Sequence, residues 1–195
     1  MRKHERTVVP RAKPARRGAR TRLRILDAAE REFAAHGFDG TSMRAIAAAA
    51  GGQLALIHYH FGSKLDLYRA VWARWFENPD MRQERIASVE AAGPAALPER
   101  LRVVVHSFFA PLFELLDSPR GRRVLAVLGR ELADPKAFSR GILDEFLAPV
   151  ARLMLQQLHA LMPELSTADV GIGYQIMAAT AQNVLMNSQR AIALS

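Results

Sequence analysis

The stretch from Gly40 to Lys64 constrains the fold of this chain more than any other. Thr41 or Ser42 can cap a helix start there, because a side-chain oxygen accepts a hydrogen bond from an unpaired backbone N–H. Apolar residues then recur at helical spacing, and the pair Gly51-Gly52 allows the positive φ that a tight turn requires. The stretch predicts two short helices joined by a turn.

The second of these helices is predicted to run from about Gln53 to Tyr59. Its spacing keeps Ile57 and Phe61 for the core and turns five residues outward: Gln53, Leu54, Ala55, Leu56 and His58. Three consecutive apolar residues cover most of a helix circumference, so core packing of Leu54 or Leu56 is the alternative. Two short helices with such a turn match a helix-turn-helix, whose second helix enters the DNA major groove.

Composition narrows the class of protein. The 195 residues suffice for one large or two small domains, and half of them are hydrophobic. The absence of cysteine excludes disulfides, cysteine zinc sites and thiol catalysis. No run of about 18 apolar residues is uninterrupted, and the N-terminus lacks an apolar signal core, so we expect a cytoplasmic protein without a membrane span.

The positive charge is concentrated at the N-terminus. Residues 1–20 hold eight Lys or Arg and one Glu, which accounts for +7 of the net charge of +8. With prolines and no apolar period, this segment is predicted to be a disordered basic arm that adds DNA phosphate contacts. A solvated tail that aids solubility is the alternative.

Helical signals continue on both sides of the two short helices. A first helix is predicted from Thr21 to His36, with Gly37 at its C-terminal cap. Ser63 and Asp66 form a capping box, which predicts a further helix beginning at Lys64. The fold class is therefore all-α, with a DNA-binding domain over residues 21–64 and a second helical domain over 65–195.

The C-terminal half is predicted to be a set of helices separated by proline-containing breaks. One helix is expected from Pro135 to Leu161, and the last from a second capping box, Ser166 and Asp169, to the chain end. Small and apolar faces on these two helices suit a four-helix dimer interface. Packing within the monomer is the alternative.

The runs ILDAAEREFAAHGFDGTSMRAIAAAAG and IHYHFGSKLDLYRAV resemble the N-terminal domain of the TetR family of bacterial transcription regulators. The resemblance covers Thr21 to Val71, and IHYHFGSK with RELADP is similar to the CecR-like branch. It implies a three-helix DNA-binding domain, a linking fourth helix, a C-terminal ligand-binding and dimerisation domain, and repression relieved by a small molecule. Where the family commonly has Val-Ser or Val-Thr this chain has Gly52-Gln53, and a frequent phosphate-contacting Tyr is His58 here.

These patterns and the resemblance together give the candidate DNA-contacting residues: Thr41, Ser42, Arg44, Gln53, Leu54, Ala55, Leu56, His58, Tyr59, His60 and Lys64. Arg44 is long enough to reach a guanine edge or a phosphate, and Lys64 lies at a helix N-terminus that suits a phosphate. Exposed leucine and alanine side chains would contact thymine methyl groups. A buried structural role is the alternative for His60, and metal binding is not expected, since residues two apart do not share a helix face.

A small apolar or aromatic effector is expected to bind among the C-terminal helices. The candidate lining is aromatic and Met residues at helical spacing: Phe108, Phe109, Phe113, Phe146, Met154, Tyr174 and Met177. Ordinary core packing of these residues is the alternative. No catalytic motif is present, so we expect no enzyme activity, no cofactor and no metal. The predicted function is a dimeric repressor of a palindromic operator, and the alternative is an architectural DNA-binding protein without an effector.

Overall fold

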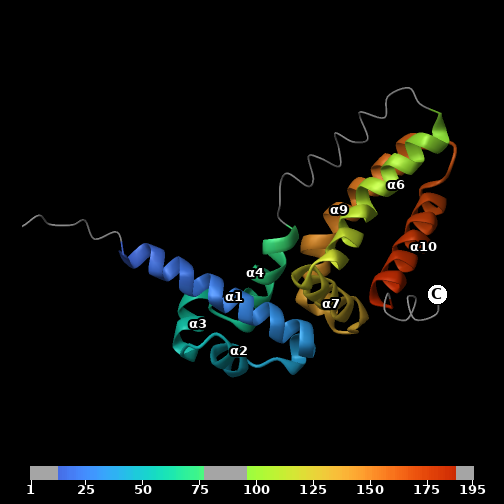
Figure 1. Ribbon diagram of the computed structural model, residues 1–195. Coiled ribbons are helices and arrows are strands. Elements are labelled where there is room, and N and C mark those ends of the chain that lie inside the picture. Colours follow the sequence, from blue (N-terminus) through green and yellow to red (C-terminus); the bar gives the residue numbers. More distant parts are fainter. Residues whose placement is uncertain (1–12, 77–95, 188–195) are drawn as a thin grey trace, which may run out of the picture.

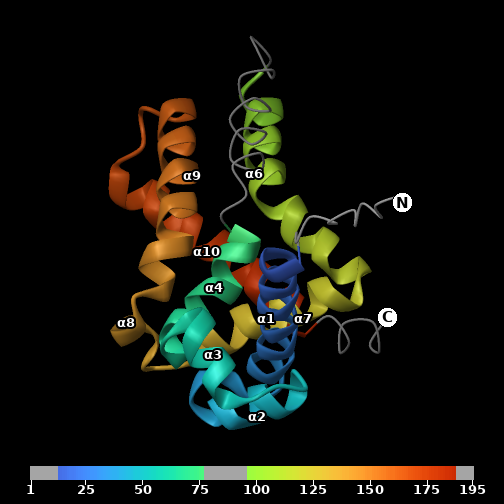
Figure 2. The same cartoon turned by 90° about the vertical axis from the view of Figure 1, so that its left-hand side faces the viewer.

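The computed structural model describes residues 13–76 and 96–187, and its regular elements in these ranges are all helices. One end of the molecule holds α1 (Lys13–Gly40), α2 (Met43–Ala49), α3 (Leu54–Phe61) and α4 (Lys64–Phe76). The other end holds α6 (Leu97–Glu114), α9 (Ala148–Leu161) and α10 (Thr167–Met186) (Figure 1). Between them, α7 (Pro119–Ala133) lies against α1, as both views show (Figures 1 and 2). The predicted all-α fold is confirmed.

Helix α1 begins at Lys13, eight residues earlier than the predicted start at Thr21. Residues 13–20 of the predicted disordered arm are therefore helical, and residues 1–12 lie outside the described residues. Alanine and arginine in this segment are strong helix formers, and extending a helix that is already nucleated requires only propagation. Pro14 is tolerated because it lies in the first turn. At the other end, Gly37 with φ +70° interrupts the helical backbone.

Helices α2 and α3 form the predicted helix-turn-helix. Gly51 adopts φ +60° in the turn, a conformation that glycine takes without steric cost. Its N–H donates to the carbonyl of Ala48 at 3.0 Å, and the N–H of Gly52 donates to the carbonyl of Ala47 at 3.0 Å. These bonds close α2 and direct the chain into α3 within a few residues.

The first four helices enclose a dense core. Phe33 of α1, Ile46 of α2 and Leu67 of α4 are each 0% exposed, and Ile57 of α3 is 1% exposed. The same core continues into α7 through Leu125 and its neighbours. Because every one of these helices contributes to the core, α3 is held in a fixed orientation with respect to α1 and α4.

The predicted helix from Pro135 to Leu161 is interrupted. It divides into α8 (Ala137–Arg140), a turn of π-helix (Leu143–Leu147) and α9, which begins at Ala148. Gly141 has φ +68°, a left-handed conformation that ends α8, and Pro149 occupies the first turn of α9, where its missing N–H costs nothing. The helical spacing of apolar residues continues across Gly141 and Pro149, but the backbone preferences of these two residues favour the end of one helix and the start of another.

The last helix begins as predicted and ends earlier than predicted. Ser166 caps α10 by accepting from the N–H of Asp169 at 3.1 Å, so the second capping box is confirmed at the helix start. The helix ends at Met186, and residues 188–195 lie outside the described residues. A second, smaller core joins α6, α9 and α10 through Val104, Met154 and Val170.

Candidate nucleic-acid interface and interior cavity

The outer face of α3 is presented to solvent by two buried anchors. Ile57 and Phe61 point into the core, so the opposite side of α3 faces outward. The exposed residues on and beside α3 are Gln53, Ala55, Leu56, His58 and Tyr59, with Leu56 40% and Tyr59 82% exposed. The predicted division of α3 into a core face and an outer face is confirmed for Gln53, Ala55, Leu56 and His58.

Four of the candidate DNA-contacting residues are wholly or partly withdrawn from the surface, namely Thr41, Leu54, His60 and Lys64. Leu54 is half-buried and packs on the first core, and His60 is half-buried beside Tyr59. Thr41 is 3% exposed, and its hydroxyl donates to the carbonyl of Gly37 at 2.8 Å. Placing Thr41 at the DNA surface was therefore wrong: its hydroxyl satisfies a carbonyl left free where α1 is interrupted.

Ser42 and Gln53 begin the two short helices differently. Ser42 caps α2, since its Oγ accepts from the N–H of Ala45 at 3.0 Å, and Arg44 is exposed two residues further on. Gln53 occupies the N-cap of α3 without a side-chain capping bond. The exposed amide of Gln53 therefore stays available for an external partner at the N-terminus of α3.

His58 has a defined local partner. Its Nδ1 lies 2.8 Å from the carbonyl of Gly62, which can only accept, so Nδ1 carries the proton. In the neutral ring Nε2 is then the acceptor. The hydrogen bond fixes the orientation of an exposed imidazole at the C-terminal end of α3.

Lys64 lies against the protein. Its ammonium is 4.5 Å from the centre of the Phe38 ring, a cation–π contact, and the side chain is half-buried. Burial lowers the pKa of Lys64 below its usual value, while Asp39 acts in the opposite direction. The Ser63–Asp66 capping box is confirmed, because the N–H of Asp66 donates to Ser63 Oγ at 3.1 Å. This box uses N–H groups that the predicted phosphate site at Lys64 would need.

Sequence reasoning assigned Arg17 and Arg20 to a disordered arm and missed Arg22 and Arg24, so it did not place this group of basic residues on the N-terminal part of α1. Arg17, Arg20, Arg22 and Arg24 are exposed there, and the guanidinium of Arg22 stacks 4.9 Å from the centre of the Phe61 ring at the end of α3. The cation–π contact brings positive charge next to the helix-turn-helix. A signal was present: residues 17, 20 and 24 are spaced three and four apart, which is one face of a helix.

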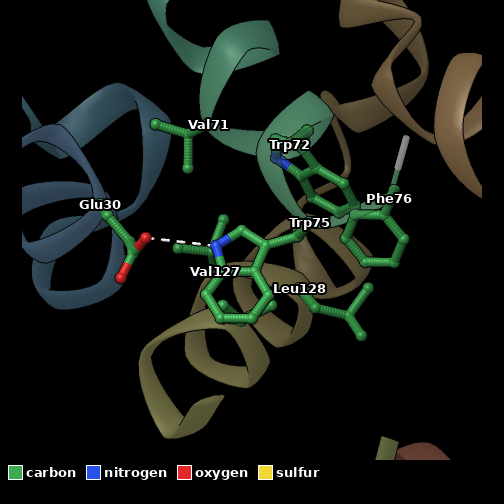
Figure 3. A pocket seen from close by; sticks show the side chains of 8 residues that line it. Glu30, Val71, Trp72, Trp75, Phe76, Val127 and Leu128 are labelled. Carbon is green, nitrogen blue, oxygen red and sulfur yellow. Dashed lines mark hydrogen bonds between the residues drawn. The ribbon is translucent and has the colours of Figure 1, made fainter. Parts of the chain in front are cut away.

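A buried carboxylate joins α1 to α4 and α7. Glu30 is 1% exposed; its Oε1 accepts from Arg123 Nε of α7 at 3.2 Å and its Oε2 accepts from Trp75 Nε1 of α4 at 3.2 Å. Figure 3 shows the Trp75 indole nitrogen directed at this carboxylate, with the Trp72 and Phe76 rings beside each other. The hollow that these residues border is only about 10 Å³, so it has room for a single water at most.

A second buried carboxylate joins α4 to α7 and α8. Glu131 is 1% exposed; it accepts the Tyr68 hydroxyl at 3.0 Å and two hydrogen bonds from Arg140 at 3.1 and 2.9 Å. Burial raises the pKa of Tyr68 well above its usual value, so this hydroxyl stays protonated as the donor. Arg130 adds a clamp, donating to the carbonyls of Ala34 and Ala35 near the end of α1. These contacts tie α7 to the DNA-binding helices.

A cavity of about 350 Å³ lies among α6, α7, α9 and α10. Four of the seven predicted lining residues border it, namely Phe108, Phe109, Met154 and Tyr174. Sequence reasoning missed Phe76, the last residue of α4, which also borders it. The signal for Phe76 was its spacing of four and eight residues from Trp72 and Tyr68, which places it on the inner face of α4.

The other three predicted lining residues do not border the cavity. Phe146 lies in the first core, with its ring centre 6.0 Å from that of Trp72, because the π turn directs it toward α4. Phe113 is 39% exposed, since five residues after Phe108 the helix has turned to its outer side. Met177 packs against the second core beside the cavity. Similar spacing therefore did not place all seven residues at one site.

Residues 13–76 and 96–187 are the ranges that the structure describes. No helix in these ranges is long and apolar enough to span a membrane. No cluster of three or more His, Cys, Asp or Glu residues with metal-binding geometry occurs in the same ranges.

Comparison with known proteins places this helix-turn-helix in a family. Residues 25–71 match the family model for bacterial regulatory proteins of the tetR family, and residues 106–195 match the Tetracyclin repressor-like C-terminal domain. The chain belongs to the TetR family. The resemblance inferred from the N-terminal runs is thereby confirmed and extends to the C-terminal helices.

Individual TetR-family relatives are distant. The transcriptional dual regulator CecR of Shigella flexneri is 28% identical over 138 residues, which are 69% of this chain and 61% of CecR. The chain thus spans about three fifths of the length of that curated relative. NalD, the secondary repressor of the MexAB-OprM efflux pump in Pseudomonas aeruginosa, has a similar fold, with TM-score 0.63, 19% identity and 88% of each chain covered. FadR of Bacillus subtilis, solved in complex with stearoyl-CoA, also has a similar fold. Its TM-score is 0.59 and its sequence identity 22%, with 86% of this chain and 88% of FadR covered.

Proposed function

We propose that this TetR-family chain is a dimeric DNA-binding transcription regulator, a repressor released from a palindromic operator by a small molecule. The observation that carries the proposal is the outer face of α3, which two buried anchors hold toward solvent beside exposed arginines. A preformed helix face with flanking positive charge suits insertion into the major groove of DNA.

The residues around α3 suggest a division between positioning and specificity. Arg20 and Arg24 on α1 are exposed cations suited to phosphate oxygens, whose contacts fix the register without sequence information. On α3, Leu56 and Ala55 offer only apolar contact, which suits thymine methyl groups. Arg44, exposed on α2, has the reach for a guanine edge.

Dimerisation is supported by the exposed side of α10. Ile172 and Ile176 are 60% and 63% exposed, and Val184 is 41% exposed on a neighbouring part of the helix surface. A helix that keeps large apolar side chains on its solvent side is typical of a helix covered in an assembly. A second copy of this chain packed on α10 would also present a second α3, as a palindromic site requires.

Effector release is supported by the position of the 350 Å³ cavity. Its wall includes Phe76, and the Phe76 ring stacks on Trp72 of the same helix at 5.1 Å. Trp72 in turn contacts Tyr68, whose ring packs on Phe33 and Phe38 near the helix-turn-helix. A ligand that binds the DNA-incompetent arrangement of α4 more tightly would lower DNA affinity about tenfold per 1.4 kcal/mol of difference. FadR of Bacillus subtilis, which has a similar fold, was solved in complex with stearoyl-CoA, a molecule with a long apolar acyl chain and a charged CoA group.

The test begins with DNA selected by the purified protein from a random pool, followed by light scattering and footprinting on the selected site. A regulator should protect a discrete palindrome as a dimer. Arg44→Ala should relax base preference by about 1–3 kcal/mol, whereas Arg20→Ala should weaken binding to all sequences alike. Arg152→Ala, an exposed arginine on α9, is the control with the same change of charge.

Two outcomes would overturn the proposal. A monomer that binds one asymmetric site tightly would remove the dimer. Continuous coating of DNA without a selected sequence would instead support the alternative of an architectural DNA-binding protein. Equal losses on every sequence for Arg44→Ala would assign that residue to the phosphate backbone.

A further inference from the structure

The wall of the 350 Å³ cavity is apolar except on one side. Leucine, valine, phenylalanine and methionine side chains from α6, α7 and α9 make most of it. The polar lining residues all come from α10, namely Tyr174, Gln175 and Gln182. None of the described residues that line the cavity is Asp, Glu, Lys, Arg or His.

The three polar groups on α10 are unused within the described part of the chain. The side-chain amides of Gln175 and Gln182 have no hydrogen-bond partner among residues 13–76 and 96–187, and the same is true of the Tyr174 hydroxyl. Gln175 and Gln182 are seven residues apart, so both lie on one side of α10, about 10 Å apart along its axis. Burial raises the pKa of Tyr174, which keeps that phenol neutral. The cavity therefore offers neutral donors and acceptors along a single wall.

We propose that this cavity takes an uncharged ligand with an apolar body and a hydrogen-bonding end, the end being held by the α10 wall. The apolar body lies against Phe76, Phe108 and Leu132, and Gln175 and Gln182 bind an amide, hydroxyl or carbonyl group. This inference rests on the proposed function, because it names the chemical class of the effector at that site.

The physical reason for the selectivity is the cost of desolvating a charge. An ionised carboxylate or ammonium entering this cavity loses its hydration and meets no opposite charge among the described lining residues. A neutral amide loses less hydration and regains hydrogen bonds from the amides of Gln175 and Gln182, which have no partner among the described residues of the protein. The volume is at the lower end of the range for small-molecule sites, so a compact ligand fits.

Three probes of one length test the class: 6-phenylhexanamide, 6-phenylhexanoate and 6-phenylhexylammonium, each titrated into the full chain by calorimetry at pH 7. We expect the amide to bind at least tenfold more tightly than either ion. Equal or tighter binding of the carboxylate or the ammonium overturns the proposal. Failure of all three to bind at millimolar concentration overturns it as well, because an open apolar cavity of this size should accept the neutral probe.

Variants of α10 test where the polar end lies. The double variant Gln175→Leu with Gln182→Leu should lower amide affinity at least fivefold, and Gln182→Lys should raise carboxylate affinity at least tenfold. The matched control is Gln156→Leu with Gln157→Leu on α9, since neither residue lines the cavity. Circular dichroism and thermal unfolding check that each variant is folded. No difference between the α10 variants and the α9 control overturns the assignment of the polar end.

Operator DNA separates this inference from the proposed function. If the amide binds selectively but leaves DNA affinity unchanged, the ligand class stands and effector release fails. If a charged molecule binds in the cavity and releases the protein from DNA while the amide does not bind, effector release stands and the ligand class fails.

Discussion

The two ends of the molecule differ in how densely their side chains are packed. Around α1 to α4 the core is dense, with Phe33, Ile46 and Leu67 fully buried and only a hollow of about 10 Å³ beside Glu30. Around α6, α9 and α10 the core is smaller and encloses about 350 Å³, and α10 leaves Ile176 63% exposed. Among the described residues, one end is tightly packed, whereas the other has a cavity and an exposed apolar face on α10.

This difference fits two kinds of recognition. DNA has a regular surface, so a helix that binds it gains from a fixed orientation, and dense packing provides that. A ligand site needs volume, and a subunit interface needs apolar surface, so both lower the stability of the isolated chain. The helix between them, α7, is bound to the dense end through Glu30 and Glu131 and borders the cavity through Leu128 and Leu132.

Truncating one phenylalanine at each end gives the largest contrast. Phe33→Ala should lower the free energy of unfolding by about 3–5 kcal/mol, because it leaves a cavity in a fully packed core. Phe109→Ala should cost under about 2 kcal/mol, since Phe109 already borders empty space and makes fewer contacts. Urea unfolding followed by tryptophan fluorescence measures both. Equal losses would show that the cavity end is as tightly packed as the DNA-binding end.

Removing one hydroxyl at each end gives a smaller contrast. Tyr68→Phe deletes a buried hydrogen bond to the Glu131 carboxylate and should cost about 1.5–3 kcal/mol. Tyr174→Phe is the matched control and should stay within about 0.5 kcal/mol, because its hydroxyl has no partner in the described part of the chain. Thermal unfolding of the two variants measures the difference. A loss of stability for Tyr174→Phe as large as that for Tyr68→Phe would contradict this expected contrast.

Helix caps extend the contrast to local structure. Ser42→Ala removes the N-cap of α2 and should lower global stability by about 1 kcal/mol, because α2 is part of the dense core. Ser166→Ala removes the N-cap of α10, and we expect local opening there with a loss of under about 0.5 kcal/mol globally. Hydrogen exchange resolves local from global opening. Unchanged exchange at the start of α10 after Ser166→Ala would count against this expectation.

The smallest effect is the pH dependence of the capping box at α4. The hydrogen bond from the Ser63 hydroxyl lowers the pKa of Asp66 below its usual value of 3.8. A carboxylate with a lowered folded-state pKa stabilises the fold above its unfolded pKa, and this contribution is lost as pH falls through the lowered value. The unfolding midpoints of wild type and Asp66→Asn should therefore differ at pH 7 and converge as the pH falls below the lowered pKa of Asp66. A constant difference across this range would rule out titration of Asp66 as the cause.

Much of the fold follows from local sequence signals. The two capping boxes at Ser63 and Ser166 fix helix starts because their hydrogen bonds involve residues only three apart. The turn at Gly51 needs a conformation that glycine adopts freely. Ile57 and Phe61 were assigned to the core correctly because one helix period separates them.

Other sequence signals were weighed incorrectly. Thr41 suited a helix cap, but the interruption of α1 at Gly37 left a carbonyl that its hydroxyl satisfies. Residues 13–20 were judged by charge and proline content, whereas they extend a helix that the core already holds. The cavity lining contains the same residue types as three residues that lie elsewhere, namely Phe113, Phe146 and Met177. The side of the helix on which each of them lies keeps it away from the cavity.

The sequence by itself determined the all-α class, the helix-turn-helix and its outward face, because each depends on hydrogen bonds and periodicity within about ten residues. Only the tertiary structure decided that Glu30 meets Arg123 and that Tyr68 meets Glu131, since these partners are 93 and 63 residues apart. The same is true of the 350 Å³ cavity. The cavity is the space left between four helices and the end of α4. Its volume therefore depends on how these helices pack together.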